Sequence, residues 1–487
     1  MTTKTIMLQG TGSDVGKSLI VAGLARAFSN QGLKVRPFKP QNMSNNAAVT
    51  EDGGEIGRAQ ALQARAARVP TSVHMNPVLL KPESTTGAQV IIQGKAAATL
   101  SARDYMKTRQ QYLPRILDSF NLLKEQADLV IVEGAGSPAE TNLRTGDIAN
   151  MGFAHAADVP VLLIGDIHRG GVIASIAGTF QMISDEDAGR LKGFIINNFH
   201  GSLELFDEGC LILEEATKTP CLGVIPHFAD AKKLPAEDAV ALEKASTSGD
   251  GKFHISVPRL SRIANFDDLD PLKLESNVTI EIIQPGSPIP ARTDLVIIPG
   301  SKATIADLKY LRQQGWDIDI IAHARHGGHV LGLCGGYQML GQSIADPDGV
   351  EGPPETITGL GLLAVETTLA GDKTLTNVSG RHCLSTTAIS GYEIHLGETT
   401  GPDRKKPFAV INGVHEGACS GNISGTYLHG CFSGDEFRRA FLQQLGVSAT
   451  PSSYDTIIDE TLDRLADHMA DHLDLEKILS IATPSSC

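Results

Sequence analysis

Apolar runs alternate with helical patterns through the first half of the chain. Short apolar segments lie at residues 5–9, 128–136, 159–168 and 191–198. After the first of them, apolar residues such as Leu24 and Phe28 recur at helical spacing. Fully apolar strands that alternate with helices are typical of a parallel sheet covered on both faces. We therefore predict an α/β domain with a doubly wound parallel sheet over residues 1–233.

A second α/β pattern follows in the C-terminal half. The run 294–301 predicts a buried strand that ends in a glycine turn, and 330–341 predicts a strand followed by a helix. Residues 234–251 end in small, flexible residues and predict a linker, which places the second domain at 252–446. Residues 447–487 are expected to form a C-terminal helical tail, whose apolar stripe consists of Leu462, Leu465, Met469 and Leu473.

Composition narrows the class of protein. The 487 residues are 41% hydrophobic and carry a formal charge of −14, which argues against general nucleic-acid binding. Seven cysteines without a C-x-x-C pair argue against a disulfide framework or a zinc ribbon. The sequence has no signal-peptide pattern and no apolar run of membrane-span length. We expect a cytoplasmic protein with small-molecule partners and no membrane partner, and leave a homo-oligomer open.

Residues 10–18 (GTGSDVGKS) lie between the first strand and the first helix, where they predict a phosphate loop. Thr11 replaces the first glycine of the common pattern, and the spacing resembles that of dethiobiotin synthetase and its relatives. The alternative is a glycine-rich turn without a nucleotide. We expect ATP to be bound by the loop residues Gly10, Thr11, Gly12, Asp14, Val15, Gly16, Lys17 and Ser18.

Magnesium is the second expected cofactor. The Ser18 hydroxyl and Glu133, at the tip of the strand in 128–136, are predicted to bind Mg²⁺. Asp52 has two interpretations, as a third magnesium ligand or as a capping residue at the start of a helix. By resemblance to dethiobiotin-synthetase-like folds, Asn197 is expected to contact the adenine.

Cys334 has the surroundings of a nucleophile. It follows an apolar strand and precedes a helix, and Gly332, Gly335 and Gly336 surround it. A sharp turn of this kind exposes the thiolate, and the helix N-terminus lowers the pKa of such a thiol. The alternative is a buried structural cysteine. His429, which ends a later apolar segment, is the predicted catalytic partner.

Residues 252–446 resemble a class I glutamine amidotransferase domain. The resemblance implies that Cys334 attacks the side-chain amide of glutamine and releases ammonia. Backbone groups at Gly300 and Gly335 are expected to hold the oxyanion, and the resemblance places Tyr392 and Glu393 beside the glutamine site. Many such domains carry a glutamate two residues after the histidine. Here that position is Cys431, so the third triad member is missing or replaced.

Longer strings resemble the cobyric acid synthase family over nearly the whole chain: FKPQNMSNN at 38–46, GEIGRAQ at 54–60, VPR at 257–259 and GGYQML at 335–340. The resemblance implies ATP- and glutamine-dependent amidation of the b, d, e and g carboxylates of adenosylcobyrinic acid a,c-diamide. The local string INNFHG at 196–201 departs from the more basic version usual in that family. Residues expected to bind this polycarboxylate corrinoid are Lys39, Asn42, Arg58, Lys81 and Arg144.

The expected chemistry is that of a ligase, because a carboxylate and ammonia do not form an amide spontaneously at neutral pH. ATP would phosphorylate the carboxylate, and ammonia would displace phosphate. A cobyrinic acid a,c-diamide synthase is the nearer alternative, since it shares both domain types. A partitioning or switch ATPase is the alternative from another class, and it would leave Cys334 and His429 without a role.

Overall fold

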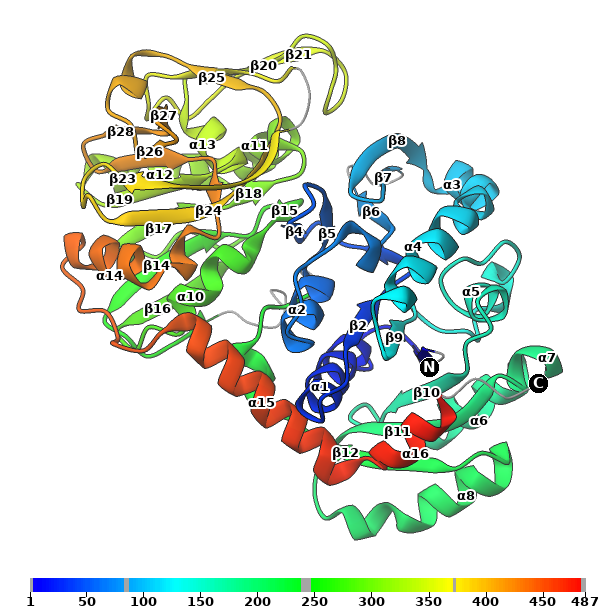
Figure 1. Ribbon diagram of the computed structural model, residues 1–487. Helices are drawn as coiled ribbons and strands as arrows, with labels where there is room; N and C mark the ends of the chain where they lie inside the picture. Colours follow the sequence, from blue (N-terminus) through cyan, green and yellow to red (C-terminus); the bar gives the residue numbers. More distant parts are fainter. Residues whose placement is uncertain (1–2, 83–86, 238–246, 371–373, 483–487) are drawn as a thin grey trace. The chain divides into compact units, whose positions relative to one another are not determined.

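The computed structural model describes residues 3–82, 87–237, 247–370 and 374–482 (Figure 1). The chain divides into two compact units. The first unit consists of residues 1–44, 50–237 and 458–487, and the second of residues 45–49 and 238–457.

The first unit is built on a six-stranded sheet in the order β12-β11-β10-β1-β9-β2. Every neighbouring pair in this sheet is parallel, as the sequence predicts. The strands are β1 (Lys4–Gly10), β2 (Val35–Phe38), β9 (Leu129–Glu133), β10 (Val161–Asp166), β11 (Leu191–Phe199) and β12 (Cys221–Pro226). The strands β2 and β9 lie on one side of β1, and β10, β11 and β12 lie on the other, so the direction of strand addition reverses beside β1. Open α/β sheets bind their ligands at such a point, at the carboxyl ends of the strands.

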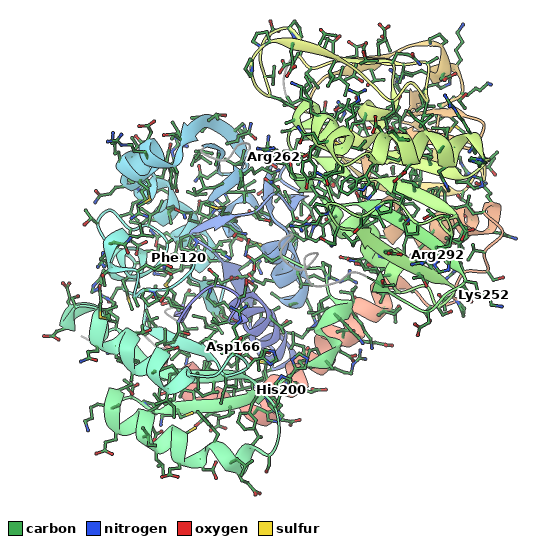
Figure 2. The ribbon with its side chains drawn as sticks, turned by 180° about the vertical axis from the view of Figure 1, so that it is seen from behind. Phe120, Asp166, His200, Lys252, Arg262 and Arg292 are labelled. Carbon is green, nitrogen blue, oxygen red and sulfur yellow. The ribbon has the colours of Figure 1, made fainter. Side chains whose placement is uncertain are left out.

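Helices follow the strands of this unit, and their apolar faces are buried. Phe38, Phe120 and Phe153 form an aromatic cluster with ring centroids 5.2 to 5.4 Å apart. Phe120 is labelled in Figure 2. Burial of such rings is among the largest apolar contributions to a core. The helices are α1 (Lys17–Asn30), α2 (Arg58–Ala66), α3 (Ala102–Thr108), α4 (Leu113–Glu125), α5 (Met151–Ala156), α6 (Val172–Met182), α7 (Asp185–Ala188) and α8 (Asp207–Thr217).

The first unit has a second sheet that the sequence analysis did not predict. Its order is β3-β6-β7-β8, with one parallel pair and two antiparallel pairs. The strands are β3 (Gln41–Met43), β6 (Val78–Pro82), β7 (Gly87–Ile92) and β8 (Lys95–Ser101). The short strand β5 (Glu55–Gly57) precedes α2.

The C-terminal helices α15 (Tyr454–His472) and α16 (Leu475–Ile481) confirm the predicted helical pattern. Residues 458–487 belong to the first unit, although the sequence predicted a separate tail at 447–487. The predicted apolar stripe is buried, and its Met469 side chain lies 2.6 Å from the position that a β-carbon on Gly23 of α1 would occupy. Arg26 of α1, also buried, forms an ion pair of 2.7 Å with Asp459.

The second unit has a seven-stranded sheet in the order β13-β16-β14-β17-β19-β29-β28. Its five inner strands are parallel, and the two edge strands are antiparallel to their neighbours. The strands are β13 (Thr247–Ser248), β14 (Phe253–Pro258), β16 (Val278–Ile283), β17 (Leu295–Ile298), β19 (His329–Leu333), β28 (Ala418–Ser420) and β29 (Ile423–Thr426). Its helices are α10 (Asp270–Lys273), α11 (Thr304–Gln313), α12 (Trp316–Arg325), α13 (Gly335–Leu340) and α14 (Asp435–Gln444).

Smaller sheets complete the second unit. An antiparallel sheet in the order β27-β26-β23-β24-β30 brings β24 beside the segment that carries His429. Its strands are β23 (Thr374–His382), β24 (Ala388–His395), β26 (Ala409–Ile411), β27 (Val414–Glu416) and β30 (Leu428–His429). The remaining strands are β4 (Ala47–Val49), β15 (Ile263–Ala264), β18 (Gly300–Ser301), β20 (Ser343–Asp346), β21 (Glu355–Thr358), β22 (Glu366–Thr368) and β25 (Glu398–Thr400).

No helix in the described parts of the chain is both long enough and apolar enough to cross a membrane.

Candidate active sites

The predicted phosphate loop connects β1 to α1 in the first unit. Its backbone enters the left-handed region at Asp14, with φ of 58°, and at Gly16, with φ of 91°. The Thr11 amide donates a hydrogen bond of 2.9 Å to the carbonyl of Ile164 on β10. This turn leads into the N-terminus of α1, where free amide groups and the helix dipole favour a phosphate.

Lys17 lies on the inside of this loop. Its ammonium group donates to the carbonyl oxygen of Gly12 at 2.8 Å and to that of Gly136 at 3.3 Å. Burial is the largest effect on Lys17 and lowers the pKa of its ammonium group. A lysine held this way has its charge beside the loop amides, where a phosphate group would bind.

Asn197 supports the loop from the end of β11. Its side-chain amide donates to the carbonyl of Val15 at 2.9 Å. The same amide nitrogen lies 2.2 Å from the position that a β-carbon on Gly16 would occupy, so only glycine fits there. The structure thus assigns Asn197 a contact with the loop, and its contact with adenine stays a prediction.

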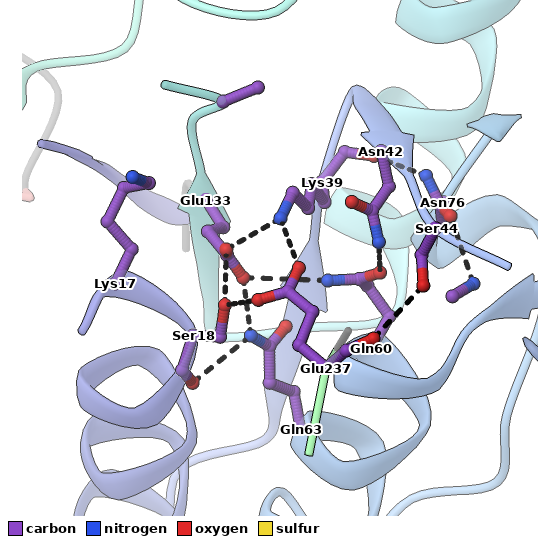
Figure 3. A network of polar contacts seen from close by, with 12 residues as sticks. Lys17, Ser18, Lys39, Asn42, Ser44, Gln60, Gln63, Asn76, Glu133 and Glu237 are labelled. Carbon is purple, nitrogen blue, oxygen red and sulfur yellow. Dashed lines mark hydrogen bonds and ion pairs between the residues drawn. The ribbon is translucent and has the colours of Figure 1, made fainter. Parts of the chain in front are cut away.

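A cluster of polar side chains lies beside Ser18 (Figure 3). Glu133, at the end of β9, accepts hydrogen bonds from the Ser18 hydroxyl at 2.7 Å and from the Gln63 amide at 2.6 Å. The Lys39 ammonium lies 2.8 Å from Glu133 and 2.8 Å from Glu237. The Ser18 hydroxyl also contacts Glu237. The sequence analysis predicted Ser18 and Glu133, but not Gln63 or Glu237.

Lys39 and its carboxylates form a charge cluster in which both Lys39 and Glu133 are buried. Burial alone would lower the pKa of Lys39, but the charges of Glu133 and Glu237 outweigh burial and raise it. Lys39 is therefore a permanent cation that bridges two carboxylates. The contact of Lys39 with the corrinoid stays a prediction.

Asp52 does not belong to this cluster. Its carboxylate is exposed and accepts hydrogen bonds from the Ser72 hydroxyl at 2.8 Å and from the Val73 amide at 3.2 Å. These contacts hold together a turn before β5 and the start of a short helical turn at Val73–Met75. The structure thus corrects the prediction of a magnesium ligand at Asp52, and a local structural role replaces it.

Three of the other residues predicted to bind the corrinoid, Lys81, Arg144 and Asn42, contact side chains of the first unit. Lys81 pairs with Glu55 at 2.6 Å, and both side chains are buried. Arg144 makes a two-pronged contact with Asp187 at 2.8 and 2.9 Å. The Asn42 amide donates to the Gln60 side chain at 2.9 Å, and Arg58 begins α2. Their binding of substrate stays a prediction.

Cys334 occupies the sharp turn between β19 and α13 in the second unit. Its backbone has φ of 51° and ψ of −109°, an unfavourable conformation for a residue with a side chain. A β-carbon on Gly336 would lie 2.1 Å from the carbonyl oxygen of Ile298, so the turn packs against β17 only because glycine stands there. This geometry supports the predicted nucleophile elbow.

His429 is a buried neighbour of Cys334 and is held by a carboxylate. Its Nδ1 lies 2.6 Å from Asp268, whose other oxygen accepts the Gly430 amide at 2.6 Å. The Cys334 side chain is close enough to the same imidazole to favour its protonated form. Burial by itself lowers the pKa of His429, but the charges of Asp268 and Cys334 outweigh burial and raise it to about 10. The arrangement is a cysteine, a histidine and an orienting aspartate.

Asp268 supplies what the sequence analysis regarded as missing or replaced. It lies in the helical turn Phe266–Leu269, 161 positions before His429, instead of two residues after it. Cys431, at that later position, is buried, and burial raises the pKa of its thiol. One feature of the sequence could have indicated Asp268: a group of aspartates follows β14, on the side of the sheet where the parallel strands have their carboxyl ends.

The residues predicted around the glutamine lie close to His429 or to the turn at Cys334. A β-carbon on Gly300 would lie 2.9 Å from the His429 ring, and one on Gly335 would lie 3.1 Å from the Ser301 amide nitrogen. The Tyr392 ring stacks on His429 with centroids 5.4 Å apart. Glu393 pairs with Leu428 across the neighbouring strand. The structure thus brings these four residues together, and their contact with glutamine stays a prediction.

Comparison with known proteins gives a match over almost the whole chain. Cobyric acid synthase of Bradyrhizobium diazoefficiens is 58% identical over 481 residues, covering 98% of this chain and 99% of the relative. That of Jannaschia sp. is 58% identical over 480 residues, covering 98% and 99%, respectively. That of Methylorubrum populi is 56% identical, covering 99% and 100%. The chain belongs to the cobyric acid synthase family.

The two units of this cobyric acid synthase family member match two separate family models. Residues 254–437 match the CobB/CobQ-like glutamine amidotransferase domain. Residues 6–241 match the CobQ/CobB/MinD/ParA nucleotide binding domain. These matches confirm the predicted fold class. A switch ATPase would account for the second match alone, whereas the family accounts for both, including the elbow at Cys334.

Proposed function

We propose that this protein amidates the b, d, e and g side-chain carboxylates of adenosylcobyrinic acid a,c-diamide and so forms adenosylcobyric acid in cobalamin biosynthesis. Glutamine supplies the nitrogen and ATP supplies the energy. The observation that carries the proposal is the match of 58% identity along 98% of the chain to proteins named cobyric acid synthase. That name favours this reaction over the synthesis of the a,c-diamide.

In the second unit, the proposed reaction is hydrolysis of the glutamine side-chain amide. The Cys334 thiolate attacks the amide carbon, and the adjacent His429 imidazolium gives a proton to the departing ammonia. Asp268 holds His429 by its Nδ1–H at 2.6 Å, which directs the other ring nitrogen away from Asp268. Backbone amides at the start of α13 and at Gly300–Ser301 stabilise the oxyanion. Water then releases glutamate from the thioester.

In the first unit, the proposed reaction is transfer of the γ-phosphoryl group of ATP to a corrinoid carboxylate. The loop amides and Lys17 hold the phosphates, and ammonia displaces phosphate from the acyl phosphate. The Ser18 hydroxyl and the Glu133 carboxylate are hard oxygen donors 2.7 Å apart, which suits Mg²⁺. When bound, Mg²⁺ would neutralise charge on the phosphates. We propose that Lys39, Asn42, Arg58, Lys81 and Arg144 contribute to corrinoid binding.

The test separates the two reactions by their nitrogen source. Wild type and Cys334→Ala are each supplied with ATP, Mg²⁺ and the a,c-diamide, with either glutamine or a high ammonium concentration, and product masses are followed. We expect Cys334→Ala to lose amidation from glutamine and to keep amidation from ammonium. Unchanged use of glutamine by Cys334→Ala would overturn the elbow assignment. Failure of the wild type to modify the corrinoid with either nitrogen source would overturn the proposed function.

A further inference from the structure

Glu237 lies in the segment that the sequence analysis interpreted as a linker, yet it contacts the phosphate loop. Its side chain is 29% exposed, and it meets the Ser18 hydroxyl and the Lys39 ammonium from one side of the cluster (Figure 3). The Ser44 hydroxyl donates to the Glu237 backbone carbonyl at 3.0 Å, which fixes the backbone there. The carboxylate is thus held at Ser18 by contacts with both its side chain and its backbone.

The contacts of Ser18 bring oxygens of two carboxylates together at one hydroxyl group. Its hydroxyl oxygen lies within hydrogen-bond distance of one oxygen of Glu133 and one oxygen of Glu237. A serine hydroxyl carries a single proton and can donate to only one of them. Three oxygens therefore converge on one hydroxyl proton, and of the three only the Glu133 oxygen has a further donor within the described part of the chain, the Lys39 ammonium. Such a group of oxygens is stabilised by a hard cation.

Gln63 gives an independent indication of a missing ligand. Its amide nitrogen donates to Glu133 at 2.6 Å, and its whole side chain is buried. Its side-chain oxygen has no hydrogen-bond partner among the residues that the structure describes. Figure 3 shows this amide among the side chains of Ser18, Glu133 and Glu237. A buried carbonyl oxygen without a partner is unfavourable, and a cation or its water shell would satisfy it.

Lys39 shows that a positive charge is favoured between these carboxylates. Its ammonium lies 2.8 Å from an oxygen of Glu133 and 2.8 Å from an oxygen of Glu237. One monovalent cation balances only part of the charge of two carboxylates. The other oxygen of Glu237 lies at the Ser18 hydroxyl, on the side where a phosphate loop serine holds its metal. The Glu133 oxygen that contacts Lys39 also contacts Ser18.

We propose that Glu237 is a ligand of the magnesium ion that accompanies ATP, together with Ser18 and Glu133. This inference rests on the proposed ATP-dependent function of the same site. Glu237 takes the third position that the sequence analysis gave to Asp52. The nucleotide site then includes a residue that follows all six strands of the central sheet in the chain.

The test measures metal binding directly, with Mn²⁺ in place of Mg²⁺ and a non-hydrolysable ATP analogue. Electron paramagnetic resonance reports free Mn²⁺ for the full-length wild type, Glu237→Gln and Glu237→Ala. Glu125→Gln is the matched control, because Glu125 is an exposed glutamate at the end of α4 in the same unit. We expect both Glu237 variants to bind Mn²⁺ with the nucleotide at least about tenfold more weakly, since even indirect metal contacts contribute that much.

Nucleotide binding in the presence of a chelator separates a ligand from a structural support. We expect Glu237→Gln to bind the metal-free analogue as the wild type does, whereas a structural role would weaken both measurements equally. Unchanged Mn²⁺ affinity in both variants would overturn the inference. Tighter binding of Mn²⁺ by Glu237→Ala would also overturn it, because the Glu237 carboxylate would then hinder metal binding. A wild type that binds neither Mn²⁺ nor the analogue would overturn the proposed ATP site itself.

Discussion

At the scale of single residues, the pairing of His429 with Asp268 determines how the glutaminase site works. The 2.6 Å contact fixes the ring and stabilises its protonated form. In Asp268→Asn we expect glutamine-driven amidation to fall by about a hundredfold or more, because the wrong tautomer is favoured. Ammonium-driven amidation, followed by product mass, should stay unchanged. Asp348→Asn, at an exposed aspartate of the same unit, is the control and should behave as wild type in both assays.

The same pair predicts the pH dependence of glutamine hydrolysis. The charges of Asp268 and Cys334 raise the pKa of His429 to about 10, so the imidazolium persists up to that pH. Removing the carboxylate removes one cause of the raised pKa. The alkaline limb of the activity profile of Asp268→Asn should therefore move to lower pH than in the wild type. An unshifted limb, measured as kcat/KM for glutamine against pH, would contradict this role of Asp268.

At the scale of elements, the elbow depends on close packing of α13 against β17. A β-carbon on Gly336 would stand 2.1 Å from the Ile298 carbonyl oxygen, a backbone atom that cannot rotate away. Gly336→Ala should lower the free energy of unfolding of the second unit by about 3 kcal/mol and abolish glutamine hydrolysis. Chemical denaturation gives the first value, and glutamate release gives the second. Gly352→Ala, where no atom lies within 4 Å of the added carbon, should change neither.

The helix α15 contributes a surface ion pair to a buried arginine of α1. Arg26 has a side-chain exposure of 1% and pairs with Asp459 at 2.7 Å and with Asp463 at 3.4 Å. Because Asp459 is 48% exposed, solvent weakens the pair, and Asp463 remains in Asp459→Ala. We expect a loss of about 1–2 kcal/mol in the first unit, measured by thermal unfolding. The control is Asp471→Ala, at an exposed aspartate of the same helix. If Asp459→Ala lost no more stability than this control, the stabilising role of the Arg26–Asp459 pair would be contradicted.

Local patterns predicted the elements that consist of continuous apolar runs. The strands β9, β10 and β19 consist largely of such runs, and β9 ends at the site residue Glu133 while β19 leads directly into Cys334. The sheet of β3, β6, β7 and β8 was missed, because its strands are short or polar and because β3 pairs with β6 across more than thirty residues of sequence. The helical pattern of α15 was predicted, but its packing against Gly23 was not, since a stripe of apolar residues does not show which element it packs against.

The candidate sites show the same limit. Cys334, His429, Lys17, Ser18 and Glu133 stand out because each ends a strand or begins a helix in a recognisable string. Asp268 and Glu237 lie 161 and 219 positions away from the residues they contact, in short irregular segments. Asp52 was chosen for its place at the start of a helix, and the fold directs it toward Ser72 instead. Only the folded structure brings distant polar residues together.

At the scale of the whole molecule, each unit carries the residues for one half-reaction. The first unit contains the phosphate loop and its carboxylates, and the second contains Cys334, His429 and Asp268. The central claim is that nitrogen released in one half-reaction is consumed in the other. Neither half-reaction alone, whether glutamine hydrolysis or ATP hydrolysis, would establish this claim.

Heavy-nitrogen labelling tests the claim most directly. The wild type receives ATP, Mg²⁺, the corrinoid a,c-diamide and glutamine labelled with heavy nitrogen in its side-chain amide, in a buffer that contains unlabelled ammonium. Mass spectrometry then determines the nitrogen in each new amide. We predict one labelled amide at each of the b, d, e and g positions. A product whose new amides carry only unlabelled nitrogen, or a corrinoid that gains no amide while glutamine is hydrolysed, would contradict the account.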